Sequence, residues 1–152
     1  MLHGALPASL AAVSPMDTIS PERRSENMRR IRCKNTKPEL IVRAALFGMG
    51  YRYRLHSGKL PGKPDLAFPK LRKAIFVHGC FWHNHSHIHC KIARFPKSNS
   101  EYWADKLRRN VERDTLHRSE LRKLGWKSLV IWECQTKSIE KQLSRIRRFL
   151  EE

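Results

Sequence analysis

The sequence predicts a mixed α/β domain, in which a central β-sheet of mixed strand direction is flanked by helices. Apolar residues recur at helical spacing over residues 36–46, whereas residues 73–78 (KAIFVH) form the short, continuous apolar run of a central strand. The 152 residues suffice for one hydrophobic core but not for two. We therefore expect one domain over residues 17–152. Residues 1–16 are expected to be a disordered or untranslated extension, because Met16 is a plausible alternative start.

Two helices are expected at the beginning of the domain. Ser20-Pro21 combines a capping residue with a proline in the first turn, which predicts a basic helix to about residue 31. Thr36 and Glu39 have the spacing of a capping box and begin a second helix, which ends at Gly48. The expected buried face of this second helix consists of Leu40, Ile41, Ala44, Ala45 and Leu46.

The remaining elements alternate between strands and helices. Three successive strands are expected, at residues 51–55, 65–68 and 73–78. A long helix follows from about Ser98, again with capping-box spacing, to Gly125. Residues 126–133 form the last strand, and Ser138 caps a terminal helix. The first three strands predict a meander, and the helical crossover favours a parallel partner for the last strand.

The charge of the chain indicates a polyanionic partner. Lys and Arg number 31 against 14 Asp and Glu, which gives a formal net charge of +17. Such an excess favours nucleic acid over a membrane surface, because phosphate contacts release condensed counterions. No apolar stretch approaches the ~20 residues that span a bilayer, which excludes an integral membrane protein. Some basic residues of the long helix are expected on phosphates and others in solvent: Lys106, Arg108, Arg109, Arg113, Arg118 and Lys123.

A cluster of cysteines and histidines predicts a zinc site. Residues 80–90 read C-F-W-H-N-H-S-H-I-H-C, and Cys134 follows the last strand. Cys80, Cys90 and Cys134 with one imidazole would provide the tetrahedral set that zinc prefers. Spacing alone permits His83, His85, His87 or His89 as the imidazole ligand. The competing interpretation is a solvated polar loop with Cys134 as an ordinary buried cysteine. Cys33 is expected to be a bystander.

A second metal site, for a hard cation such as magnesium, is expected at Asp65, the last residue of the motif L-P-G-K-P-D. A carboxylate at the start of a strand can bind magnesium together with a main-chain carbonyl and phosphate oxygens, although aspartate is also common after a turn. The arrangement resembles the P-D…(D/E)-x-K nucleases of the type II restriction fold, with Phe76-Val77-His78 where an acid and a lysine would stand. The carbonyl of Val77 would then complete the shell, and His78 or His83 would handle protons.

Aromatic residues stand between the zinc-ligand candidates. In a nuclease, Phe81 and Trp82 would be wedges that enter the base stack. Burial in an ordinary core is the alternative. Trp103, Trp126 and Trp132 occupy apolar positions of expected elements and are predicted to be core.

From about Asp17 to Thr136 the chain resembles the very short patch repair (Vsr) endonucleases. The likeness runs through R-S-E-N-M-R-R-I, N-T-K-P-E-L, L-P-G-K-P-D, F-V-H-G-C-F-W-H-N-H, N-V-E-R-D and L-V-I-W-E-C, in that order. The resemblance implies a type II restriction endonuclease-like fold, in which Asp65 and the main chain of Val77 bind Mg²⁺ and His83 is the general base. His78 and Glu39 would assist, although a capping box explains Glu39 equally well.

The resemblance also implies the zinc ligands Cys80, His85, Cys90 and Cys134. The loop before Cys90 is a few residues longer than is usual in the family, so His87 competes for a ligand position. Met28, on the first helix, is implied to intercalate from the opposite groove, against the alternative that it packs on the sheet.

The implied reaction is a nick on the 5′ side of the thymine in a T:G mismatch left by deamination of 5-methylcytosine. A DNA cytosine-5 methyltransferase and bacterial mismatch-repair proteins are implied as functional partners, in the cytoplasm and at the nucleoid. Two rivals stand beside this reading: a non-catalytic zinc-stabilised DNA-binding module, and a nuclease of another class whose histidine-rich loop holds the catalytic metal.

Overall fold

The computed structural model describes residues 20–31 and 33–152, and divides into two units at Ile31. The first unit contains helix α1 (Pro21–Arg30), which carries Met28. Its cap is the predicted one, because Ser20 Oγ accepts a hydrogen bond from the Arg23 N–H at 3.3 Å. The extension expected over residues 1–16 lies outside the described residues.

The second unit is built on a four-stranded sheet in the order β1-β2-β3-β4. Its strands are β1 (Arg54–Leu55), β2 (Leu66–Phe68), β3 (Lys73–His78) and β4 (Lys127–Trp132). The first three form an antiparallel meander, and β3 pairs parallel with β4 in the register Val77 to Ile131. The predicted mixed sheet is therefore confirmed, including the parallel pair that the crossover helix produces.

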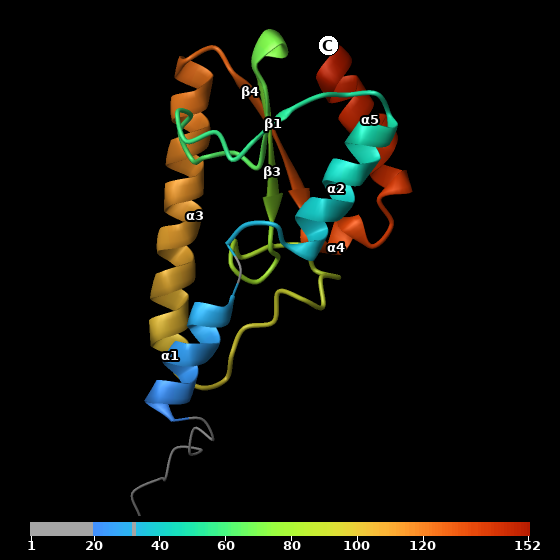
Figure 1. The fold of residues 1–152 in the computed structure, drawn as a ribbon. Helices are drawn as coiled ribbons and strands as arrows, with labels where there is room; N and C mark the ends of the chain where they lie inside the picture. The colour runs from blue at the N-terminus through green and yellow to red at the C-terminus, as the bar shows by residue number, and fades with distance from the viewer. Residues whose placement is uncertain (1–19, 32) are drawn as a thin grey trace, which may run out of the picture. The chain divides into compact units, whose positions relative to one another are not determined.

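Helices cover both faces of this sheet (Figure 1). Helices α2 (Lys37–Gly48) and α5 (Glu140–Glu151) pack on one face, where Leu46 and Ile146 meet Ile75 and Ile131 in the main core. Helix α3 (Ser100–Lys123) lies on the other face, where Leu121 packs on Phe76 and Val130. Neighbouring residues of β3 and β4 thus bury opposite faces, as the alternation of a strand requires.

Two helix starts differ from the expectation. Helix α3 begins after Asn99, a residue with φ +52° and no side-chain capping bond, so Ser98 does not cap it. A short helix, α4 (Glu133–Thr136), stands between β4 and α5, and α5 begins after Ile139 instead of Ser138. In both places a serine matched a capping pattern, but the chain enters the helix one residue later.

The buried face of α2 agrees with the prediction only in part. Leu46 is buried as predicted, but Leu40 is 48% exposed and Ala44 is exposed. The other buried residues are Glu39 and Val42, which were not predicted. The three buried residues are spaced by three and four positions, so a polar residue, Glu39, shares the interior face with Val42 and Leu46. The turn expected after β2 is a 3-10 helix, η1 (Pro69–Leu71).

Candidate active site and metal centre

Asp65 stands between a rigid turn and the first residue of β2. Its Oδ2 accepts a hydrogen bond from the Val77 N–H of β3 at 2.7 Å, which joins the two residues that the sequence assigned to one metal site. Burial raises the pKa of Asp65, and the neighbouring carboxylate of Glu39 raises it further, although the Val77 N–H opposes both. An incompletely paired carboxylate in this position favours a bound cation.

The turn before Asp65 is packed against α3. Gly62 has φ +74°, and a Cβ built there would lie 2.9 Å from His117 Cβ. A side chain at position 62 is therefore excluded both by backbone conformation and by helix α3. This contact fixes the turn, and with it the start of β2.

His78, the last residue of β3, stacks on His83. The ring centroids are 3.8 Å apart with an interplanar angle of 7°. His83 Nδ1 lies 2.5 Å from Asp114 Oδ2 of α3. Burial raises the pKa of Asp114, but the hydrogen bond and charge of His83 outweigh burial and hold it below the usual value. The pair leaves the other ring nitrogen of His83 for a proton from a substrate or water.

His78 is held in its neutral form. Its side chain is buried, and desolvation together with the nearby charges of His83 and Arg118 lowers its pKa to about 3, against an opposing effect of Asp114. Near neutral pH this ring carries no charge. His78 is therefore suited to stack on and orient His83, whereas His83 is the ring with a carboxylate partner.

These groups line one pocket of about 200 Å³. Asp65, Val77, His78, His83 and Asp114 all contribute to its wall. The sequence predicted the first four, and the structure brings them together. Asp114 was not assigned a role from the sequence, although it is the last residue of the quoted N-V-E-R-D motif.

Glu39 turns away from the helix cap and into the interior. Thr36 Oγ1 accepts the Glu39 N–H at 3.4 Å, so one half of the capping box is present. The Glu39 carboxylate instead forms an ion pair with Arg43 and lies 2.9 Å from His56 Nε2. Ligand atoms of Glu39, His56 and Asp65 lie within 4.8 Å of one another. Glu39 thus adjoins the Asp65 site, and neither Arg43 nor His56 carried a sequence signal that identified it.

Four cysteine and histidine side chains converge in a possible metal centre. Ligand atoms of Cys80, His85, Cys90 and Cys134 lie within 4.8 Å of one another. His87 does not belong to this set of four. His85 is the histidine that the resemblance implied, and its Nδ1 lies 3.6 Å from Cys134 Sγ.

The surroundings of this centre hold its side chains in place. The His85 ring stacks on Trp132, with centroids 4.1 Å apart, and Glu133 Oε2 accepts the Cys80 N–H at 3.3 Å. Burial raises the pKa of the Cys80 thiol to about 12, and burial also raises that of Cys134. Such thiols become thiolates readily only with a nearby cation, and three sulfurs with one imidazole are a donor set that suits zinc.

An aromatic cluster stands beside both sites. Phe81 and Trp82 contact each other edge to face, with centroids 5.0 Å apart. Trp103, predicted to be core, instead packs on these two rings from α3, at 5.4 Å and 6.0 Å. Lys106 Nζ lies 5.6 Å from the centroid of the Trp82 ring. The sequence missed Trp103 because an apolar position on an amphipathic helix resembles a core position, whichever neighbour it meets.

The pocket holds a carboxylate, Asp65, beside a histidine–aspartate pair, and this combination is suited to the hydrolysis of a phosphodiester. The net charge of +17 suits a nucleic-acid substrate. Together these features are those of a nuclease. Comparison with known proteins gives the family. Residues 16–90 match the sequence model of the DNA mismatch endonuclease Vsr. The chain belongs to the Vsr family of DNA mismatch endonucleases.

Individual relatives support this assignment. The chain is 44% identical to a type II nicking enzyme of Xanthomonas oryzae pv. oryzae, over 89% of this chain and 97% of the relative. It is 40% identical to a type II nicking enzyme of Neisseria meningitidis, over 90% and 95% of the two chains. It is 42% identical to the DNA mismatch endonuclease Vsr of Escherichia coli, over 78% and 74%.

The helices within residues 20–31 and 33–152 do not combine the length and apolar character needed to cross a membrane.

Proposed function

We propose that this endonuclease nicks double-stranded DNA on the 5′ side of the thymine in T:G mismatches that arise from deamination of 5-methylcytosine. The observation that carries the proposal is the pocket in which Asp65, His83 and Asp114 meet, next to the aromatic cluster of Phe81 and Trp82. Cleavage of one strand is supported by similarity to proteins that are themselves named nicking enzymes.

Magnesium is the proposed catalytic ion, held by Asp65 and the main-chain carbonyl of Val77. Asp65 fits this task because it is partly buried, is hydrogen-bonded to Val77, and has a raised pKa that a cation would offset. When bound, the ion supplies charge stabilisation for the scissile phosphate and for the attacking water.

His83 is the proposed general base. Its Nδ1 is engaged by Asp114, so its Nε2 is the atom that takes the proton from water. Asp114 fixes the ring and favours the charged imidazolium that results. His78 assists by stacking on His83, and Glu39 assists through its position beside Asp65.

Zinc is proposed as a structural ion on Cys80, His85, Cys90 and Cys134. It would tie the loop after β3 to the start of α4, and would thereby fix the position of His83 between Cys80 and His85 in sequence. The type II restriction endonuclease-like fold belongs to the same proposal, and is supported by the mixed sheet with helices on both faces.

Mismatch recognition is assigned to apolar wedges. Phe81 and Trp82 would enter the base stack from the face that carries the active site, and Met28 of α1 would intercalate from the opposite groove.

The endonuclease domain is proposed to extend over residues 17–152.

The cellular setting follows from the substrate. A DNA cytosine-5 methyltransferase would produce the base whose deamination creates the mismatch, and bacterial mismatch-repair proteins are proposed partners, in the cytoplasm at the nucleoid, without a membrane association.

The test is a nicking assay on two duplexes that differ only in carrying T:G or C:G at one position, with and without Mg²⁺. We expect one nick, in the thymine strand, in the T:G duplex with Mg²⁺ only. Equal cleavage of the two duplexes would remove mismatch repair from the proposal, and undiminished cleavage without a divalent ion would remove magnesium.

A further inference from the structure

Arg118 occupies the active-site pocket without an assigned task. It stands four residues after Asp114 on α3, which places both on one face of the helix. Both line the pocket with Asp65, His78 and His83. A nuclease pocket must neutralise a phosphate whose negative charge increases during attack, and the end of β3 that lines this pocket, residues 76–78, supplies no lysine or arginine.

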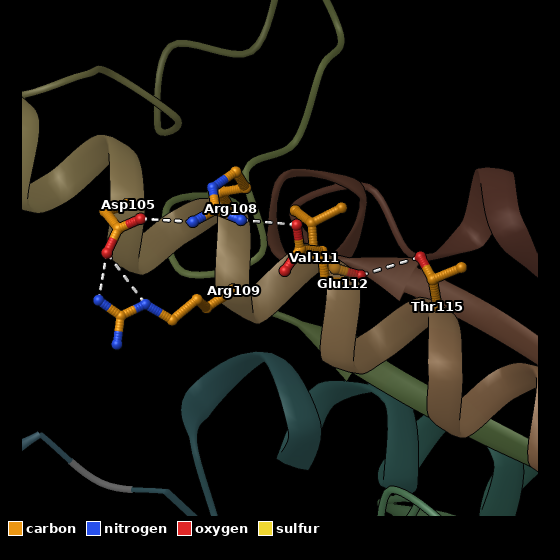
Figure 2. A network of polar contacts seen from close by, with 6 residues as sticks. All are labelled: Asp105, Arg108, Arg109, Val111, Glu112 and Thr115. Atoms are coloured by element: carbon orange, nitrogen blue, oxygen red, sulfur yellow. Dashed lines mark hydrogen bonds and ion pairs between the residues drawn. The ribbon is translucent and has the colours of Figure 1, made fainter.

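Three other arginines of α3 are engaged within their own helix. Arg108 donates to Asp105 and Glu112, at 2.5 and 2.8 Å, and Arg109 donates to Asp105 (Figure 2). Arg113 donates to Asn110 Oδ1 at 2.9 Å. Among the residues that the structure describes, Arg118 has no such hydrogen bond or ion pair, so its guanidinium can bind a phosphate without first giving up a partner.

We propose that Arg118 binds the phosphate at which the strand is cut and stabilises the negative charge that develops there in the transition state. The proposal rests on the proposed function, because it needs a phosphodiester in this pocket. In the step itself, the water oxygen bonds to phosphorus, its proton passes to His83, and the bond from phosphorus to the leaving oxygen breaks. The leaving oxygen takes its proton from solvent, and Arg118 neither gives nor accepts one.

The geometry of the pocket favours Arg118 over Lys63, the lysine that also lines it. Arg118 lies on the same face of α3 as Asp114, the partner of His83 at 2.5 Å, whereas Lys63 belongs to the turn before Asp65. A planar guanidinium also matches two phosphate oxygens at once, which an ammonium does not.

The experiment compares Arg118→Met, Arg118→Lys and the control Arg122→Met. Arg122 is an exposed arginine one turn further along α3, outside the pocket. Single-turnover nicking of the T:G duplex is measured with Mg²⁺. We expect Arg118→Met to slow nicking on the order of 100-fold, Arg118→Lys to remain within about 10-fold of wild type, and Arg122→Met to match wild type.

DNA binding is measured separately, without a divalent ion, over a range of salt concentrations. Loss of one phosphate contact is expected to reduce the slope of log Kd against log salt by about 1 in Arg118→Met. On a duplex whose linkage 5′ of the mismatched thymine is an uncharged methylphosphonate, wild type and Arg118→Met should give the same slope, because the contacted charge is gone.

Two results would overturn the role of Arg118: nicking by Arg118→Met at the rate of Arg122→Met, or a difference in slope that persists on the methylphosphonate duplex. Failure of the proposed function has a different signature. If the proposed function is wrong, the wild-type protein itself does not nick the T:G duplex. The salt dependence of DNA binding by wild type and Arg118→Met would still show whether Arg118 contacts a phosphate.

Discussion

At the residue scale, the proposed proton transfer depends on two side chains that come from different elements, His83 from the loop after β3 and Asp114 from α3. Asn at position 114 keeps the shape of the side chain but removes the charge that favours the imidazolium and fixes its ring. We expect Asp114→Asn to slow nicking by about 10²- to 10⁴-fold in single-turnover kinetics, with DNA binding retained.

The control for that substitution is Glu112→Gln. Glu112 is an exposed acid on the same helix and pairs with Arg108 at 2.8 Å. The Glu112→Gln variant should nick the T:G duplex at the wild-type rate. Equal rates for the two variants would show that Asp114 does not act through His83.

His78 makes folding depend on pH. Its pKa is about 3 in the folded protein against 6.5 when exposed, so the unfolded chain binds a proton first as the pH falls. The contribution of His78 to stability is complete above pH 6.5 and is lost as the pH falls from 6.5 toward 3. Between pH 7 and 5.5 the free energy of unfolding should fall by about 1 kcal/mol more in wild type than in His78→Gln.

Urea unfolding of zinc-saturated protein at the two pH values measures this difference. His89→Gln, in an exposed loop position, is the matched control and should keep the wild-type dependence. An identical pH dependence in His78→Gln would mean that His78 is protonated in the folded protein.

At the scale of elements, the turn before β2 depends on close packing against α3. In Gly62→Ala the added Cβ would meet His117 at 2.9 Å and hold a strained φ of +74°. We expect a loss of about 1–3 kcal/mol in the free energy of unfolding, measured in urea, together with slower nicking because Asp65 is displaced.

Gly58 provides the control for this substitution. A Cβ at Gly58 would have open space around it, and its φ is not in the left-handed range. Gly58→Ala should therefore leave both stability and nicking close to wild type. If Gly62→Ala were equally neutral, the turn would not be held by His117.

Elements were predictable where the hydrophobic period was strong. Residues 73–78 form β3 with the predicted bounds, since an apolar run of that length between turn residues fits a central strand. Local capping patterns were weaker, because Ser98 and Ser138 are capping residue types like Ser20 but do not cap a helix. The starts of these two helices each lie one residue later than predicted, which is within the range by which local patterns locate helix ends.

At the scale of the whole molecule, the site is assembled from parts that are distant in the chain. Asp65 and His83 could be predicted because they lie in short motifs of reactive residue types. Trp103 and His56 could not, because their roles depend on which rings and carboxylates the fold places beside them. Glu39 was predicted in part. The capping-box spacing correctly predicted the hydrogen bond from its N–H to Thr36, but it did not predict the ion pair of its carboxylate with Arg43.

The central claim is that two ions have separate tasks, a hard cation at Asp65 for chemistry and zinc at the cysteine centre for structure. Asp65→Asn tests it most directly, because asparagine can still accept the Val77 N–H while it loses the charge that holds magnesium. Zinc content and nicking of the T:G duplex are measured on one purified sample. We expect about one zinc per chain, as in wild type, and no nicking. Retained nicking, or loss of zinc together with activity, would contradict the claim.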